Sequence, residues 1–226
     1  MDNLNTMNKE ILFNENVISY ALYKNYFSIG SKIFFRVSHN IKIGRNWNYW
    51  CAPEVDVIEV TKDNNVIAYE LKGVRKGRKK IVKSKEESPN FPAFYDGIGQ
   101  VLAYLNLPYV NETDPSPNLN KFNGGAFDFV YLVYARKQSE FPEYERKILN
   151  LLPIGITFAL PNGEFVKVKE ASKNPLQSKE AKEHFLENLN TLDKFSIKGK
   201  IFRKIKEQGE RYFQSIETDI KLKEIQ

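Results

Sequence analysis

The sequence has few of the residues on which several common kinds of site depend. It has one cysteine, Cys51, which cannot form an internal disulfide, and two histidines, His39 and His184, which lie far apart in the chain. No cysteine or histidine spacing typical of a zinc site occurs, and the glycines form neither a P-loop nor a dinucleotide fingerprint. No apolar run approaches the roughly 20 residues needed to span a bilayer, and the first ten residues lack the basic and apolar regions of a signal peptide. We therefore expect a soluble, cytoplasmic protein with no membrane partner and no dependence on ATP or NAD.

Length and composition indicate one globular unit. With 226 residues, 42% hydrophobic and 27% charged, the chain suits a single compact α/β domain with an appendage better than two domains. We expect a core over residues 1–177, with a mixed central β-sheet flanked by helices. A helical extension over residues 178–226 should pack on or beside this core.

The positive charge of the chain is local. The net charge is +6, but the segment from Lys72 to Lys85 holds eight basic residues and no acidic one, so the remainder carries about −2. Such a run is usually a solvated loop. It also suits a polyanion, because each phosphate that a cation neutralises releases counterions and adds salt-dependent affinity. The candidate nucleic-acid-binding residues of this segment are Arg75, Lys76, Arg78, Lys79, Lys80 and Lys83.

Hydrophobic periodicity predicts the following elements. Helices are expected within 8–28, over 92–106 and over 142–152, with two more from Ser178 onward. Strands are expected over 33–37, 55–60, 66–72, 127–135, 154–160 and 164–169, the strand at 127–135 being apolar on both faces and therefore central. The segment 39–52, with Trp47, Tyr49 and Trp50, should be irregular or an edge strand, its aromatic residues either packed under the sheet or in contact with nucleic acid. A polar connection is expected from Pro108 to Gly125.

An acidic hairpin is the main candidate site. The strands at 55–60 and 66–72 flank T-K-D-N-N, a turn-forming cluster, and carry A-P-E-V-D and A-Y-E-L-K. Side chains alternate along a strand, so Glu70 and Lys72 share a face. If the numbers of opposed residues sum to 126, the loop is Lys62 to Asn64 and Asp56 lies across from Glu70. A register shifted by one residue would place Asp56 on the wrong face.

The chemistry of this triad suits phosphodiester hydrolysis. Two carboxylates provide the oxygen ligands that Mg²⁺ or Mn²⁺ prefers, and such an ion lowers the pKa of bound water. An ammonium group at Lys72 can orient the attacking water or stabilise developing charge. The tripeptide pattern alone is weak, because it recurs at Glu145–Lys147, Glu180–Lys182 and Asp219–Lys221, all on expected helices. The alternative is a surface ion pair between Glu70 and Lys72 with Asp56 an exposed strand residue.

The order helix, strand, acidic hairpin ending in E-L-K, and a helix with G-I-G-Q-V-L-A-Y-L resembles the PD-(D/E)XK nuclease superfamily, the restriction-endonuclease-like fold. The resemblance covers roughly residues 10–170. It implies that Asp56 and Glu70 are metal ligands, that the backbone carbonyl of Leu71 completes the site, and that Lys72 is the catalytic lysine. Val55 stands where a proline is often found, and Pro53 lies three residues before Asp56.

Further site residues follow from the same resemblance. Gln100 and Tyr104 match the Q-x-x-x-Y helix motif of the exonuclease-like branch. This match implies that Gln100 is a catalytic residue that points toward the site, and that Tyr104 lies beside it and is a candidate nucleic-acid-binding residue. At 100° per residue both lie off the stripe of Phe94, Ile98, Val101, Leu102 and Leu105, so ordinary solvent exposure is the alternative. Glu15 on the first helix is the best match for an additional acidic ligand, although acidic residues also favour a helix N-terminus for electrostatic reasons.

We therefore predict a DNA nuclease that depends on Mg²⁺ or Mn²⁺, with an endonuclease, unspecialised or structure-selective, ranked first. Resolution of Holliday junctions would require a homodimer that places two sites across the junction. Exonucleolytic processing of DNA ends would suit Gln100 and Tyr104, and a restriction-like or mobile-element endonuclease would suit a free-standing chain. An alternative of another class is a non-catalytic nucleic-acid-binding module that uses the basic loop and the cations from Lys200 to Arg211.

Overall fold

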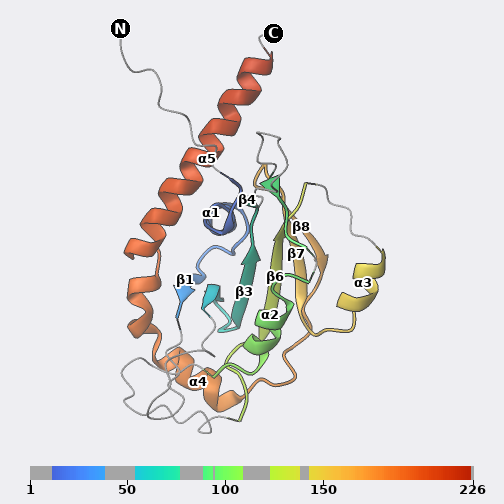
Figure 1. Ribbon diagram of the computed structural model, residues 1–226. Coiled ribbons are helices and arrows are strands. Elements are labelled where there is room, and N and C mark those ends of the chain that lie inside the picture. Colours follow the sequence, from blue (N-terminus) through green and yellow to red (C-terminus); the bar gives the residue numbers. More distant parts are fainter. Residues whose placement is uncertain are drawn as a thin grey trace, which may run out of the picture.

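The computed structural model describes residues 12–38, 54–76, 89–93, 95–108, 123–137 and 143–224, with the side chains of 76, 89 and 219–224 left aside. This part of the chain is an α/β structure with a six-stranded mixed sheet and a long C-terminal helix (Figure 1). The helices are α1 (Glu15–Asn25), α2 (Ile98–Leu105), α3 (Glu143–Leu149), α4 (Lys179–Glu187), the 3-10 helix η2 (Leu189–Phe195) and α5 (Lys200–Glu224). The strands are β1 (Lys32–Val37), β2 (Val55–Val60), β3 (Val66–Lys72), β4 (Arg75–Lys76), β5 (Pro89–Asn90), β6 (Phe129–Ala135), β7 (Gly155–Ala159) and β8 (Phe165–Lys169).

The main sheet has the strand order β1-β2-β3-β6-β7-β8. Strands β1, β2 and β3 form an antiparallel meander, after which α2 crosses over so that β6 runs parallel to β3. Strand β7 is also parallel to β6, and β8 turns back antiparallel to β7. The predicted hairpins at 55–72 and 154–169 and the central position of the apolar strand at 127–135 are confirmed, because β6 lies between β3 and β7.

The predicted hairpin register is confirmed along β2 and β3. The observed pairs run from Val57 opposite Tyr69 to Val60 opposite Val66, and each pair sums to 126. The amide of Thr61 also donates to the carbonyl of Asn65, so the loop proper is residues 62–64, as expected. The paired residues end one position before Asp56 and Glu70. Beyond that point the Asp56 side chain, and not its backbone, bonds β3.

Each face of the sheet is covered by a separate apolar layer. One layer contains α2 residues such as Tyr104 with Ala68, Leu132 and Phe158, and the other packs α1 and α5 on Val57, Tyr69 and Val133, among others. Helices α1 and α5 lie side by side at this second face (Figure 1). Helix α5 comes close to α1 at Gly209, where a Cβ would collide with the ring of Tyr20.

The helix expected at 92–106 is shorter and rotated relative to the prediction. It begins at Ile98, after Gly97 with φ +84°, and its buried residues are Val101, Tyr104 and Leu105. Leu102, which the periodicity assigned to the apolar stripe, is 38% exposed, whereas Tyr104 is completely buried. The prediction was wrong here because a tyrosine can enter a core when its hydroxyl finds acceptors there. Phe94 lies outside the described residues.

The C-terminal segment packs against the rest of the molecule at both ends. Two helices were expected after Ser178, and the structure has α4 and α5 with η2 between them. The α4 side chain of Lys182 pairs with buried Asp128 at 2.7 Å, and Phe202, Ile205 and Tyr212 of α5 join the apolar layer around α1. Across the residues that the structure describes, no helix has the length and apolar character needed to cross a bilayer.

Candidate functional site

Asp56 lies where β2 separates from β3. Its carboxylate Oδ2 accepts a hydrogen bond of 2.8 Å from the amide of Leu71, so a side chain satisfies an amide at the end of the β2–β3 ladder. The side chains of β2 also change sides of the sheet at this point. Val57 packs in the apolar layer that contains α1, whereas Val55 packs in the layer that contains α2. Asp56 is 8% exposed. The β2–β3 pairing therefore ends at Asp56, and the Asp56 carboxylate is held beside the last residues of β3.

Glu70 and Lys72 lie together at the end of β3, as their spacing predicts. The Lys72 ammonium donates to Glu70 Oε1 and, at 2.8 Å, to Gln100 Oε1 of α2. Glu70 and Lys72 are buried, and Gln100 is exposed at its helix surface. Gly97 permits this approach of α2, because a Cβ there would collide with the aliphatic chain of Lys72. The lysine is thus fixed between a carboxylate and an amide oxygen.

Tyr104 is part of the same cluster but is inaccessible. Its hydroxyl lies beside Glu70 Oε2 and 2.6 Å from the carbonyl oxygen of Glu54. A hydroxyl has one proton, so it donates to one of these two acceptors at a time. Because Tyr104 is completely buried, the structure corrects the prediction that it contacts nucleic acid directly. Its placement suits a role in holding Glu70.

Burial dominates the electrostatics of the acidic pair. It raises the pKa of Asp56 to about 8, with a further rise from the charge of Glu70 and an opposing effect from the Leu71 amide. Burial also raises the pKa of Glu70, against the lowering effect of its hydrogen bonds with Lys72 and Tyr104. Two desolvated carboxylates next to each other disfavour simultaneous ionisation. The positive charge of Lys72 therefore does not fully compensate the two carboxylates.

Glu15 approaches this cluster from α1. A Cβ at Gly73, directly after Lys72, would collide with the backbone of Asn14 and Glu15, so the α1 N-terminus rests on the end of β3. The charge of Glu15 is a smaller cause of the raised pKa of both site carboxylates, and its own carboxylate lies 3.6 Å from Arg75. Within the described ranges, however, no three histidine, cysteine, aspartate or glutamate side chains form a group that could hold a metal ion.

The donor set fits a hard divalent cation. Asp56 and Glu70 are the two carboxylates that could hold Mg²⁺ or Mn²⁺, with the Leu71 carbonyl directly after Glu70 in the sequence, and oxygen ligands are those such ions prefer. A bound cation would favour the ionised form of both carboxyl groups, whose pKa values burial raises.

The basic segment leaves directly from the site. Arg75 and Lys76 form β4, which pairs antiparallel with β5, so the segment starts and returns as a short two-stranded ribbon beyond β3. The Arg75 side chain is 67% exposed. Arg78, Lys79, Lys80 and Lys83 lie outside the described residues, as do Trp47, Tyr49, Trp50 and Cys51, and only the backbone of Lys76 is described.

Two arginines near the site were not predicted. Arg36 has φ +51°, a strained value for a non-glycine residue, and the β1–β2 pairs on either side place it opposite Asp56. Its guanidinium bonds Asn16 at 3.0 Å and Glu54 at 3.2 Å. Arg136 follows β6 on the face that carries Lys72. Their positions depend on strand pairing between distant segments, and the sequence carries no local signal for either.

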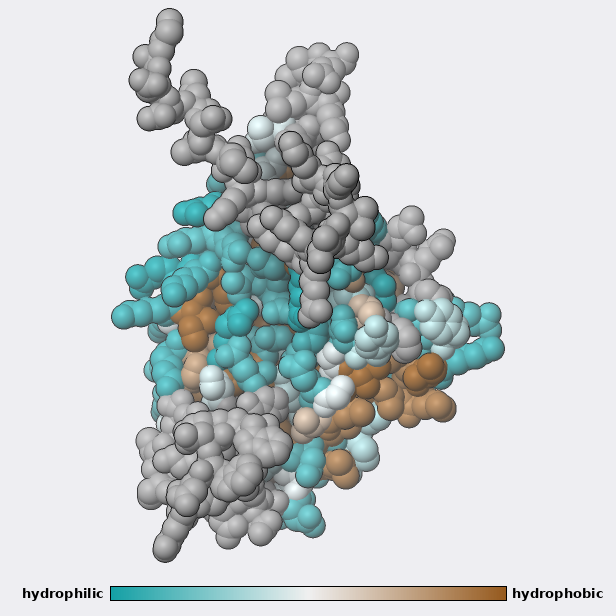
Figure 2. Space-filling model, viewed as in Figure 1, coloured by the Kyte–Doolittle hydropathy of each residue, from teal (hydrophilic) through white to brown (hydrophobic). Residues whose placement is uncertain are grey.

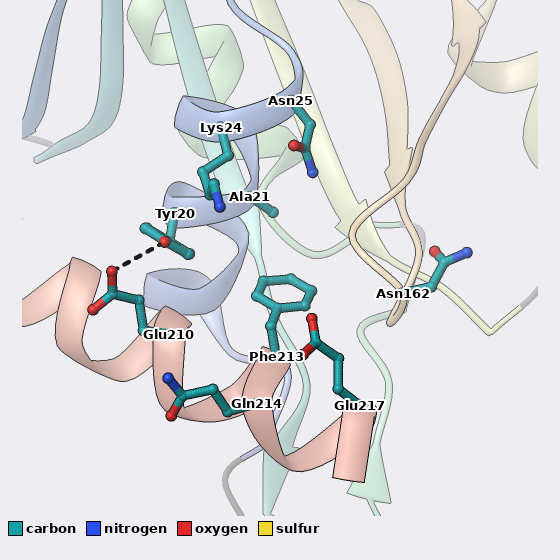
Figure 3. A pocket seen from close by; sticks show the side chains of 9 residues that line it. All are labelled: Tyr20, Ala21, Lys24, Asn25, Asn162, Glu210, Phe213, Gln214 and Glu217. Atoms are coloured by element: carbon teal, nitrogen blue, oxygen red, sulfur yellow. Dashed lines mark hydrogen bonds between the residues drawn. The ribbon is translucent and has the colours of Figure 1, made fainter. Parts of the chain in front are cut away.

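A surface cavity of about 440 Å³ lies away from this cluster (Figure 3). Figure 3 shows it between α1, α5 and the turn after β7, with Tyr20 and Phe213 among polar side chains and the Tyr20 hydroxyl 3.4 Å from Glu210. None of the acidic-site residues lines it. Its mixed charges, with Lys24 against Glu210 and Glu217, indicate no single kind of ligand.

The fold and the site together define an α/β protein with a six-stranded mixed sheet and a buried Asp–Glu–Lys cluster at the end of a central strand. Comparisons with protein-family models, with curated proteins and with solved structures found no match to this chain. What the cluster does must therefore be inferred from its geometry and chemistry.

Proposed function

We propose that this protein is a divalent-metal-dependent DNA nuclease of the PD-(D/E)XK kind, acting as an endonuclease on phosphodiester bonds. One observation carries the proposal: Asp56, Glu70 and Lys72 meet at the end of β3, with Gln100 and Tyr104 of the crossover helix bonded into the same cluster. The element order from α1 through the β2–β3 hairpin to α2 agrees with that expectation. A chance ion pair would not require the tyrosine, the glutamine and the second carboxylate.

The residues have separable roles in this proposal. Asp56, Glu70 and the Leu71 carbonyl hold Mg²⁺ or Mn²⁺, which when bound would lower the pKa of water and neutralise charge on the phosphate. Lys72 places an ammonium beside Glu70, where it orients the attacking water and offsets negative charge developing on the phosphate. Gln100 holds the ammonium from the other side.

Tyr104 restricts the rotation of Glu70, and the Leu71 amide restricts that of Asp56. Both carboxylates are thus oriented before substrate arrives, which reduces the cost of organising the site during reaction. Glu15 contributes negative charge from α1, although Arg75 partly compensates it.

The test is cleavage by the purified protein with Mg²⁺, with Mn²⁺ and with EDTA. Substrates are supercoiled, linear, single-stranded, flap and four-way-junction DNA, which also separate endonuclease, exonuclease and junction-resolving activity. Lys72→Ala should abolish cutting and leave DNA binding intact. Lys179→Ala, which removes a lysine whose side chain is 82% exposed on α4, is the matched control and should cut normally. Cutting that survives both Asp56→Ala and Glu70→Ala would refute the assigned site.

A second candidate is a non-catalytic nucleic-acid-binding module. It is favoured by the contact between Lys72 and Glu70, which already neutralises one carboxylate, and by the lack of a three-ligand group within the described ranges. In that case DNA would bind through the segment after Lys72 and remain intact with either metal. Binding without cutting on all five substrates, with Lys72→Ala behaving as the parent does, would establish this alternative.

A further inference from the structure

Arg136 lies at the carboxyl end of β6, one strand away from Lys72. Lys72 is opposite Tyr134 in the parallel β3–β6 pair, so Arg136 is two residues farther along the neighbouring strand. With a rise of about 3.3 Å per residue and a strand spacing of about 4.8 Å, the Cα atoms of Lys72 and Arg136 are about 8 Å apart. The guanidinium lies 5.5 Å from the ring centres of Tyr134 and Phe158, both in the α2 layer. Arg136 and the acidic cluster therefore share a sheet face.

The guanidinium of Arg136 is held in place but has hydrogen-bonding capacity to spare. Two aromatic rings flank it, and Nη2 contacts Glu145 of α3 at a long 3.4 Å. Its Nε is buried and has no hydrogen-bond partner among the described residues. The side chain is 21% exposed, so part of it reaches the surface. A guanidinium carries five donors in a planar fork and binds phosphate in a bidentate manner when it is pre-oriented in this way.

Three cations lie just beyond the ends of β3 and β6: Arg75, Arg136 and Lys137. Lys137 follows directly and lies 5.3 Å from the ring of Phe91, next to the β4–β5 ribbon that carries Arg75. Acidic groups also lie on this side: Asp56 and Glu70 of the cluster, Glu15 at 3.6 Å from Arg75, and Glu145 and Asp96, which act on Tyr134 together with Arg136. Asp96 accepts a hydrogen bond from the Ala93 amide at 3.0 Å. Cations therefore follow the ends of two adjacent strands, Arg75 after β3 and Arg136 with Lys137 after β6.

We propose that Arg136 binds a backbone phosphate of the strand being cut, one to two nucleotides from the phosphate at Lys72. This proposal deepens the nuclease function and rests on it for the position of the cut. The estimated Cα separation of about 8 Å is of the order of the distance between neighbouring phosphates of one DNA strand. Arg136 would position the substrate, since its place beyond Lys72 lies outside the acidic cluster. The ligand is an internal phosphodiester of DNA.

The experiment measures DNA binding as a function of salt. A fluorescent 30-base-pair duplex without terminal phosphates is titrated with protein in EDTA at several KCl concentrations, on a Lys72→Ala background that removes cutting. Each phosphate contact contributes about 0.9 to the slope of log affinity against log salt. Arg136→Gln, which keeps a planar polar group between the rings, should lower the slope by about 0.9 and weaken binding at low salt. Lys179→Gln, a charge loss at a remote exposed site, should leave the slope unchanged.

A second variant separates a local contact from a folding defect. Arg136→Lys keeps the charge but loses the planar fork, so the slope should stay near that of the parent while affinity falls several-fold. Thermal unfolding of each variant accompanies the titration. An unchanged slope in folded Arg136→Gln overturns the proposal, and so does an effect that appears only when the duplex carries terminal phosphates. If Arg136→Gln does not fold, a lowered slope in Arg136→Lys overturns the proposal.

The two proposals fail in different ways. A lowered slope for Arg136→Gln in a protein that never cuts DNA would support the phosphate contact and remove the nuclease function. A protein that cuts, with Lys72 required and the slope independent of Arg136, would retain the nuclease and lose the contact.

Discussion

Asp56→Asn should stabilise the metal-free protein while abolishing its activity. Burial and the charge of Glu70 raise the pKa of Asp56 from 3.8 to about 8 in the folded state. Between about pH 4 and pH 8 the folded protein therefore holds a proton that the unfolded chain has already released. The resulting stability is present at low pH and is lost as the pH rises toward 8. Each unit of pH costs about 1.4 kcal/mol over that range, or about 3 kcal/mol from pH 5 to pH 7 as an upper limit.

Asparagine removes this cost and keeps the contact. Its amide oxygen can still accept the hydrogen bond from the Leu71 amide. At pH 7 the variant should be more stable than the parent by about 2 to 4 kcal/mol, the larger value being the full cost of holding the proton. A shallower pH dependence should remain, because burial also raises the pKa of Glu70.

The assay is urea unfolding in EDTA at pH 5, 6, 7 and 8, repeated at pH 8 with Mg²⁺. A ligand at 100 times its dissociation constant stabilises by about 2.7 kcal/mol, so Mg²⁺ should stabilise the parent and leave Asp56→Asn unaffected. Asp63→Asn, in the exposed turn of the same hairpin, is the control and should follow the parent. The reasoning is refuted if parental stability stays constant or increases between pH 5 and pH 8, or if Asp56→Asn is the less stable protein at pH 7.

Three further predictions concern the support of the site. Tyr104→Phe removes the buried hydroxyl beside Glu70, so we expect a loss of about 1 to 3 kcal/mol in urea unfolding and a lower kcat at similar KM, whereas unchanged kcat would mean that the tyrosine does not orient the carboxylate. Gly73→Ala should lower both stability and cleavage, because its Cβ collides with backbone, whereas Gly99→Ala meets nothing within 4 Å and should be neutral or up to about 1 kcal/mol stabilising; equal melting temperatures would contradict this. Asn174→Ala leaves two buried carbonyl oxygens without their donor and should lower the free energy of unfolding by about 1 to 3 kcal/mol. The fraction of unfolded protein should increase in thermal unfolding, whereas the specific activity of the folded protein should stay the same.

The hairpin could be predicted in detail because local rules determine it. A turn-forming cluster between two β-rich runs indicates the hairpin, and the requirement that Asp56 and Glu70 share a face selects the register in which Val57 pairs with Tyr69. The shared position of Glu70 and Lys72 at the end of β3 also followed, since it needs only alternation along one strand. These are interactions between residues close in sequence.

The orientation of α2 could not be predicted in the same way. Periodicity ranked Leu102 as core and Tyr104 as surface, but the choice was made by acceptors on other elements, the Glu70 carboxylate and the Glu54 carbonyl. Arg36 shows the same limit, because only the β1–β2 pairing brings it opposite Asp56. Arg136 depends on a parallel pair formed across more than 60 residues of intervening chain. Such positions are set by tertiary structure rather than by local pattern.

One exposed apolar patch lies at α3 and the residues directly after it. Figure 2 shows brown surface in the region where Figure 1 draws α3, and the exposed apolar side chains there include Ile148 at 47% and Leu151 at 85%. The residues of the candidate active site lie mainly on β2, β3 and α2. A junction-resolving dimer would need to bring two such sites to one DNA molecule, so the mass of the protein in solution bears directly on that alternative.

The packing of α5 on α1 bears on synthesis as well as on structure. Phe202, Ile205 and Tyr212 complete the apolar layer that also contains Val17 and Ile18. A nascent chain on the ribosome cannot close that layer until the segment near residue 212 has left the exit tunnel. The β2–β3 hairpin, whose contacts are local, can form much earlier. Under the proposed nuclease function, the site would be completed only after α5 has been synthesised, because α1 rests on Gly73 at one end and packs along α5.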